Sequence, residues 1–377
     1  MRRSGGPPQS PRQSSYNGPM SRQPQFIDAL VVGQGLAGSL VAWELIRRQR
    51  RVVVVEPGRP DAASRVAGGI ISPVTGPRFS RPPELERLIS DATDLYGEIE
   101  DCFRFVVFRQ TTIHRVLRDD LEVAQATKRH EDPKYAPYLS ELQPSGSLGP
   151  AIHDPRGSVQ VRGARLSPGR LLDRLRDFFR DTARLVEMPF SAKDLVLRGN
   201  RPEWRGYRPR HVIFCEGWQV RENPWFHWAP VRPSKGETLT VEIDGELPEG
   251  ILNAGHWLIP LGENWYRLGA TFRRDETDCE PTEAGRRELL EAARGMLATS
   301  DTIRVIQHDA GVRPGKTDKY PVLGRHPDHP QLALLNGLGS RGALLAPHYA
   351  RLLADHLEKA SPIPQAADIR SWHAKAS

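Results

Sequence analysis

Cysteine is scarce in this chain of 377 residues, which contains only three. Cys102, Cys215 and Cys279 lie far apart and show none of the close spacings that bind a metal ion. Scarce cysteine is typical of a reducing compartment. We therefore expect three buried free thiols, no metal site and a cytoplasmic protein.

Long apolar runs are absent too. No stretch approaches the roughly 20 apolar residues that a helix needs to cross a bilayer, so we expect no membrane span. Hydrophobic residues make up 38% of the chain and there are 8 tryptophans, which suits a soluble globular protein. A chain of this length favours two lobes over one.

Residues 1–25 lack acidic side chains altogether. They hold five prolines and four arginines, and they supply +4 of the formal net charge of +7. Such a segment cannot bury enough apolar surface to fold, so it predicts a disordered basic tail. It lacks the apolar stretch that a secretory signal peptide contains, and its prolines argue against an amphipathic transit peptide. The rest of the chain is only mildly basic and gives little support to nucleic-acid binding, although that partner stays open.

A glycine-rich turn over residues 31–38 joins an apolar strand to an amphipathic helix. Gly33 permits the tight turn, Gly35 lets the backbone approach a pyrophosphate, and Gly38 lets the helix pack on the strand. Leu36 and Ala37 open the helix, where free N–H groups and the positive dipole end attract phosphate. The pattern predicts dinucleotide binding.

A second apolar strand over residues 52–55 ends on Glu56. A carboxylate at this place can accept hydrogen bonds from a ribose diol. The alternative is a glycine-rich turn without a ligand, which leaves Glu56 unexplained. Strand, turn, helix and terminal acid together make the dinucleotide interpretation strong.

Residues 332–342 repeat the order of strand, flexible turn and helix start. The turn contains Gly339, Ser340, Arg341 and Gly342, and its backbone donors again favour a negatively charged group. Two such turns suit a cofactor with a phosphate end and a separate electron-poor ring. The alternative is a plain helix start capped by Ser340.

Five segments in this order resemble the FAD-dependent amine oxidoreductases of the D-amino-acid oxidase, glycine oxidase and sarcosine oxidase group. The resemblance covers residues 26–360 and is carried by residues 31–38 with Glu56, 62–70, 214–218, 235–239, and 311–314 with 337–342. It implies non-covalent FAD, a small-molecule amine or amino acid as substrate, and hydride transfer from its C–H bond to flavin N5. The imine then hydrolyses, and dioxygen or another acceptor reoxidises the flavin.

The resemblance also implies the fold and its division. We expect an α/β protein with a Rossmann-like FAD-binding domain and an inserted mixed or antiparallel β-sheet substrate domain. The predicted parts are a tail at 1–25, an FAD-binding domain at 26–80, 145–217 and 305–360, a substrate domain at 81–144 and 218–304, and a tail at 361–377. Residues 127–150 are expected to form a loop, because they are rich in Pro, Tyr, Ser and Gly.

Further cofactor residues follow from the matching segments. The small-residue stretch containing Ser64, Arg65, Gly68 and Gly69 is implied to lie beside the isoalloxazine, and Gly217 follows the third nucleotide-binding strand. The turn over residues 338–342 would donate backbone N–H groups to flavin O2 and N1. Arg341 could add positive charge there or face solvent.

Arg313 is the candidate substrate residue. It is expected in a turn held by Pro314, where its guanidinium offers two parallel donors to a carboxylate. The matching arginine of amino-acid oxidases in this group binds the substrate carboxylate; an ion pair between the lobes is the alternative. His256 and Tyr266 are weaker catalytic candidates, on strands expected to form the floor of the pocket.

Two alternatives to amine oxidation remain. Residues 72–79 and 337–342 look most like the oxidase domain of the bifunctional enzyme that modifies the tRNA wobble uridine, which suggests oxidation of a modified nucleoside. No segment is expected to form that enzyme's methyltransferase domain. Glu216 stands where relatives usually have a small residue, which keeps open a flavin-binding assembly or sensor protein without catalysis.

Overall fold

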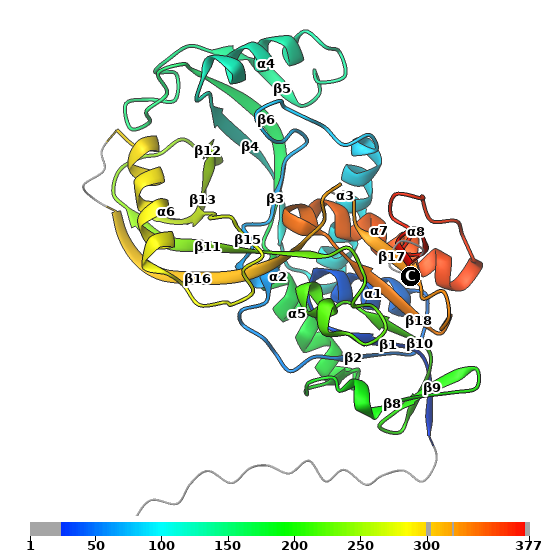
Figure 1. The fold of residues 1–377 in the computed structure, drawn as a ribbon. Coiled ribbons are helices and arrows are strands. Elements are labelled where there is room, and N and C mark those ends of the chain that lie inside the picture. Colours follow the sequence, from blue (N-terminus) through cyan, green and yellow to red (C-terminus); the bar gives the residue numbers. More distant parts are fainter. Residues whose placement is uncertain (1–23, 299–302, 319, 374–377) are drawn as a thin grey trace, which may run out of the picture.

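The protein is described here by a computed structural model, which covers residues 24–298, 303–318 and 320–373. Two β-sheets form two lobes, with the nucleotide-type lobe below and the second lobe above it in Figure 1. Residues 1–23 of the predicted tail lie outside the described residues. No helix in the described part is long and apolar enough to cross a membrane.

The first sheet has the strand order β17-β18-β10-β1-β2-β7, and its central strands pair in parallel. Alternate residues of β1 contribute to two different apolar clusters, with Val31 in one and Leu30 and Val32 in the other. Burial on both faces explains the continuous apolar run. The strands are β1 (Gln25–Val32), β2 (Val52–Val55), β7 (Leu185–Val186), β8 (Leu195–Arg198), β9 (Arg201–Trp204), β10 (Tyr207–Phe214), β17 (Val322–Arg325) and β18 (Leu332–Asn336).

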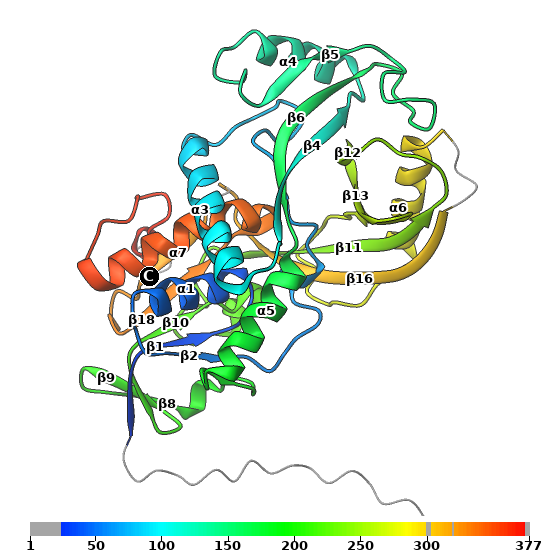
Figure 2. The ribbon, with the colours of Figure 1, turned by 180° about the vertical axis from the view of Figure 1, so that it is seen from behind.

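Four helices pack on one face of this sheet, and Figure 2 shows α1, α3 and α7 next to one another. They are α1 (Leu36–Arg47), α3 (Leu85–Phe103), α5 (Pro168–Asp181) and α7 (Gly342–Lys359). Each presents an apolar face to the same core, for example Leu40, Leu95 and Leu353. The Rossmann-like lobe expected from the sequence is confirmed.

The second sheet is mixed, as expected: its pairings are antiparallel except for that of β12 with β4. One face is covered by α6 (Glu283–Met296), and α4 (Asp120–His130) lies at the far end. The strands are β3 (Ile70–Ile71), β4 (Phe108–Val116), β5 (Leu139–Gln143), β6 (Ser158–Leu166), β11 (Arg232–Ile243), β12 (Ile251–Ala254), β13 (His256–Gly262), β14 (Trp265–Gly269), β15 (Arg273–Arg274) and β16 (Ile303–Gly315).

Two local expectations were wrong. Residues 127–150 are not all loop, since α4 runs to His130 and β5 adds a strand that pairs with β6. Residues 311–314 are not a turn, because β16 continues to Gly315 and pairs along its whole length with β11. Cross-strand pairing overrides the turn tendency of Gly311 and Pro314, and it places Arg313 on a rigid strand.

The two sheets take some of their strands from other segments than the predicted domains do. The domain boundaries themselves stay a prediction. Strand β6, within 145–217, belongs to the second sheet, and so does β16 at the start of 305–360. Helix α3, within 81–144, packs on the first lobe. The expected tail from residue 361 buries Ile363, Ala367 and Ile369 and forms α8 (Arg370–His373).

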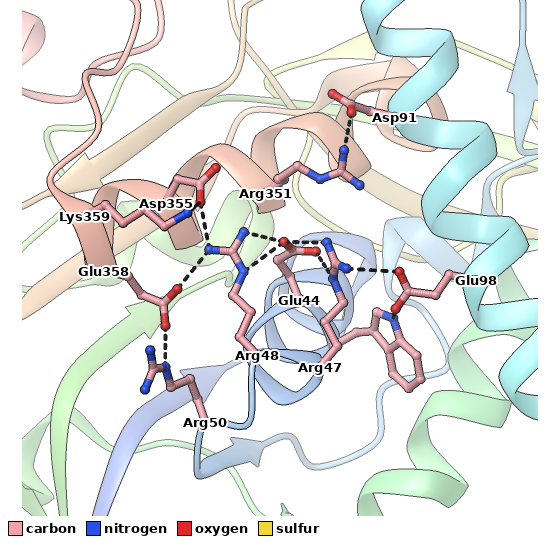
Figure 3. A network of polar contacts seen from close by, with 11 residues as sticks. Glu44, Arg47, Arg48, Arg50, Asp91, Glu98, Arg351, Asp355, Glu358 and Lys359 are labelled. Carbon is pink, nitrogen blue, oxygen red and sulfur yellow. Dashed lines mark hydrogen bonds and ion pairs between the residues drawn. The ribbon is translucent and has the colours of Figure 1, made fainter.

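An ion-pair network joins α1 to α7 and α3 (Figure 3). Glu44 on α1 is fully buried and accepts hydrogen bonds from Arg47 and Arg48. Arg48 continues to Asp355 at 2.8 Å and Glu358 at 2.9 Å on α7, more than 300 residues away in the chain. Polar contacts thus hold α1, the helix that follows the glycine turn, against the last long helix.

Candidate functional site

A cavity of about 550 Å³ lies between the two sheets. Its walls come from the turns after β1, β2, β10 and β18 of the first lobe and from β11, β13 and β16 of the second. Segments far apart in the sequence meet here because the carboxyl ends of parallel strands share one edge of a sheet. The cavity therefore sits where an open α/β sheet binds ligands.

Most of the predicted cofactor residues line this cavity. They are Gly33, Gly35, Leu36, Ala37, Glu56, Ser64, Gly68, Gly69, Gly217, Gly339, Ser340 and Gly342. Arg313 lines it as well. Gly38, Arg65, Arg341, His256 and Tyr266 do not.

The first glycine turn is built as its sequence predicts. Gly33 has φ +97°, and a Cβ there would lie 2.5 Å from the carbonyl oxygen of Cys215. Gly38 faces the turn rather than the cavity, since a Cβ would meet the carbonyl oxygen of Gly33 at 1.9 Å. Both positions thus require glycine, one for its backbone conformation and both for close approach.

Glu56 is fixed at the end of β2 by two backbone amides. Its carboxylate accepts hydrogen bonds from Gln34 N at 2.9 Å and Gly58 N at 3.0 Å. Helix α1 has no side-chain cap at Gly35, while Leu36 N donates to Ser64 Oγ at 3.1 Å. The helix start and an oriented carboxylate thus face the same end of the cavity.

Gly68 and Gly69 line the cavity where the first lobe packs closely against the second sheet. A Cβ at Gly68 would lie 2.7 Å from Ile259 Cδ1, and one at Gly69 would lie 2.1 Å from the carbonyl oxygen of Leu166. Gly68 also packs against the indole of Trp257 on β13. These glycines let the backbone of the first lobe pass close under the second sheet.

The second glycine turn is tied to the turn after β10. Asn336 Nδ2 donates to the carbonyl oxygen of Gly217 at 2.8 Å. Gly337 and Gly339 have φ +74° and +57°, and the short helix η3 (Gly339–Arg341) leads into α7. Ser340 makes no side-chain cap on α7, whose N-cap residue is Arg341. The capped-helix alternative for Ser340 is therefore wrong.

Arg313 lies flat over the backbone of β11, where a Cβ at Gly236 would meet its guanidinium at 2.0 Å. Its Nη1 donates to the carbonyl oxygens of Lys235 at 3.4 Å and Thr271 at 3.3 Å. Burial lowers the pKa of Arg313. Within the described ranges it forms no ion pair, so the lobe-interface pair expected as its alternative is not seen there.

His256 and Tyr266 lie on the other face of the second sheet. His256 Nε2 is 3.4 Å from Glu288 on α6, and Tyr266 is packed in the apolar cluster under that helix. Successive side chains of a strand point to opposite faces. Trp257 and, on β11, Thr238 therefore take the places at the cavity.

Arg65 and Arg341 point away from the cavity. Arg65 pairs with Asp173 of α5 at 2.5 Å, on the outer side of the short helix α2 (Ala63–Val66). Arg341 lines a smaller cavity of about 160 Å³ with Tyr320 and Tyr349, behind η3. Neither guanidinium has the placement of a cofactor ligand, although the backbone around each adjoins the main cavity.

Sequence reasoning missed several lining residues. Glu216 and Asn223 line the main cavity, and the segment Pro189 and Phe190 closes it near β7. Glu216 was noted only as a departure from relatives. A polar residue directly after a buried strand, next to Gly217, was the signal that could have identified it.

The chain matches known proteins over nearly its whole length. The family model described as FAD dependent oxidoreductase matches residues 28–356. A glycine oxidase of Bacillus licheniformis is 32% identical, with the match covering 87% of this chain and 92% of that protein. A glycine oxidase of Pseudomonas aeruginosa is 28% identical over 89% and 95% of the two chains.

More distant matches agree with these. The tRNA 5-methylaminomethyl-2-thiouridine biosynthesis bifunctional protein MnmC of Idiomarina loihiensis is 25% identical, over 90% of this chain but 57% of that protein. The crystal structure of glycine oxidase from Geobacillus kaustophilus superimposes with a TM-score of 0.78 at 19% identity, covering 90% of this chain and 96% of that one. The chain belongs to the family of FAD-dependent oxidoreductases.

Proposed function

We propose that this enzyme oxidises the C–N bond of a small amine that carries a carboxylate, such as an amino acid, with non-covalently bound FAD. The observation that carries the proposal is Arg313. This guanidinium is partly buried at the wall of the cavity, where it contacts two backbone carbonyls and the ring of Phe272 but, among the described residues, no carboxylate. A buried cation without an anion is costly, and a substrate carboxylate would satisfy it.

The residues present fit FAD. The Gly33 turn and the start of α1, where Gly35 offers no side-chain cap, suit the diphosphate, and Glu56 suits a ribose diol. Gly68 and Gly69 line the same cavity without side chains, which suits a flat ring beside them. The turn around Gly339 offers backbone donors to the ring edge. The three cysteines are not placed for attachment by any family motif, which supports non-covalent binding.

When bound, FAD supplies the two-electron acceptor for a C–H bond next to the amine nitrogen. The protein's own residues position that C–H bond for the transfer. Arg313 would fix the carboxylate through two parallel hydrogen bonds, and Trp257 would limit the entry of water beside Gly68. Arg313, Thr238 and Trp257 are not bases at neutral pH, which suits a substrate that binds as the neutral amine.

The test is anaerobic flavin reduction by a panel of amines with and without a carboxylate. Arg313→Ala should keep the yellow FAD spectrum but weaken binding of carboxylated amines by about 2–4 kcal/mol, or roughly 30- to 1000-fold. Arg313→Lys keeps the charge but loses the fork, and should recover part of the loss. Equal reduction by all amines in both proteins would refute the assignment of Arg313.

The same panel separates the alternatives. It should include uridines that carry a substituted aminomethyl group at C5, because the match to a protein of 5-methylaminomethyl-2-thiouridine biosynthesis keeps a nucleoside substrate in view, although the glycine oxidases match more strongly. If no amine reduces the flavin, the result supports the alternative of a flavin-binding assembly or sensor protein without catalysis. Reoxidation of the reduced enzyme in air tests dioxygen as acceptor.

We also propose that the enzyme is cytoplasmic, because its low cysteine content is typical of a reducing compartment.

A further inference from the structure

Glu216 stands beside the phosphate-binding turn. It lies two residues beyond the end of β10, and an ideal Cβ built on Gly33 would lie only 3.6 Å from Glu216 Cα. Glu216 lines the main cavity together with Gly33 and Glu56. An acidic residue thus adjoins the space that, under the proposed function, receives the most negatively charged part of FAD.

The hydrogen bonds around Glu216 come from neutral groups. Asn223 Nδ2 donates to Glu216 Oε2 at 2.8 Å. The amide orientation of Asn223 is fixed, because its Oδ1 accepts from the backbone N–H groups of Trp225 at 2.9 Å and Phe226 at 3.0 Å. In the part of the chain that the structure describes, Glu216 forms no ion pair with a lysine, arginine or histidine.

The other charges of the cavity do not offset Glu216. Glu222, on the short helix η2 (Gly217–Glu222), adds a like charge, and Glu56 is a third carboxylate at this end. Arg59 is paired with Asp61 through a hydrogen bond of 2.9 Å. The remaining charged lining residue, Arg313, lies on β16 of the other lobe and is separate from the turn at Gly33.

These surroundings favour the neutral acid. Burial raises the pKa of Glu216 to about 7, and the charge of Glu222 acts in the same direction against the hydrogen bond from Asn223. A diphosphate bound in the same cavity would raise the pKa further, because like charges disfavour ionisation. A protonated carboxyl keeps an acceptor for Asn223 and gains an O–H donor.

We propose that Glu216 binds the cofactor as a neutral carboxylic acid next to its phosphate-ribose part, so that FAD binding takes up a proton. Cofactor affinity is then high below pH 7 and falls as the pH rises, since the ionised side chain must first be neutralised or repels the diphosphate. The glycine turns supply attraction at every pH, and Glu216 makes that attraction pH-dependent. This inference rests on the FAD site of the proposed function but not on its substrate.

The test measures FAD affinity of the apoprotein by quenching of flavin fluorescence between pH 6 and pH 9. In the wild type the Kd should rise by up to about tenfold per pH unit above pH 7. Glu216→Gln carries a neutral side chain of the same shape, so its Kd should stay nearly constant and match the wild type at pH 6. Proton uptake, measured by titration calorimetry in two buffers at pH 8, should occur in the wild type and vanish in the variant.

Glu222→Gln is the matched control, a second cavity carboxylate on the same segment. It should keep the pH slope and shift its midpoint slightly downward. Glu216→Ala provides a second neutral variant, which should also flatten the slope if Glu216→Gln folds poorly. A flat wild-type curve, or the same slope in both Glu216 variants, would overturn the proposal. Absence of FAD binding at every pH would instead overturn the cofactor site itself.

Discussion

At the residue scale, Gly38 shows how a single hydrogen atom can be required inside a helix. The residue has ordinary helical backbone, so the need for glycine comes from contact: a Cβ would lie 1.9 Å from the carbonyl oxygen of Gly33. That oxygen belongs to the turn and cannot move without changing it. Sequence spacing predicted this role, and the structure gives it a distance.

Gly38→Ala should therefore destabilise the protein by about 1–3 kcal/mol and weaken FAD binding, because overpacking shifts the turn. Gly295→Ala is the control, since Gly295 lies in α6 with open space around it. There alanine should stabilise by about 0.4–1 kcal/mol, because it restricts the unfolded chain. Urea unfolding and FAD titration check both variants, and equal effects would contradict the contact argument.

At the scale of elements, the second sheet separates neighbouring residues by its two faces. Trp257 of β13 packs on Gly68 at the cavity, whereas His256 lies toward Glu288 of α6. The pairing of β13 with β14 fixes this register, with Trp257 opposite Gly269 and Leu258 opposite Leu268. A shift by one residue would exchange the two faces.

Adjacent substitutions should thus have unequal effects on catalysis. Trp257→Ala removes the indole that lines the cavity beside Gly68, and we expect it to lower kcat/KM by at least about tenfold. His256→Ala removes a partly exposed pair worth at most about 1 kcal/mol and should leave kcat/KM nearly unchanged. Steady-state kinetics with the same substrate measure kcat/KM for both variants. Similar losses in both variants would show that the sheet face does not decide the role.

Several elements were predictable because their signals are local. Helix α5 begins with Pro168 in its first turn, where proline is favoured, and this signal is carried by the sequence itself. The strand ending before Glu56 and the strand at Leu332 were likewise expected. Strand β5 and the continuation of β16 through Pro314 were not, because both depend on partner strands far away in the sequence.

At the scale of the whole molecule, α1 is held by charges as well as by apolar packing. Glu44 has no exposed surface, and Arg48 connects it to Asp355 and Glu358 of α7. Burial raises the pKa of Glu358, but hydrogen bonds from Arg48 and Arg50 outweigh it and leave that pKa lowered. The ion pairs of Glu358 with Arg48 and Arg50 therefore stabilise the fold above about pH 4. Their contribution is lost as the pH falls through the lowered pKa of Glu358.

Glu44→Ala leaves the guanidinium groups of Arg47 and Arg48 without their buried acceptor. We expect it to lower the free energy of unfolding by about 3–5 kcal/mol. Lys359→Ala, at the exposed rim of the same network, should change it by less than about 1 kcal/mol. Thermal unfolding followed by circular dichroism compares the two. If Glu44→Ala were as mild as Lys359→Ala, the network would not hold α1 to α7.

By itself the sequence determined the cofactor half of this protein. The turns at Gly33 and Gly339 and the acid at Glu56 could be read from it because backbone freedom and spacing along the chain specify them. Only the tertiary structure decided the rest: that Trp257 and not His256 reaches the cavity, that Arg313 lies on a strand among carbonyls, and that Glu216 lines the cavity beside Gly33 with no ion pair among the described residues. These facts depend on strand register and on contacts between distant segments, and neither is encoded locally.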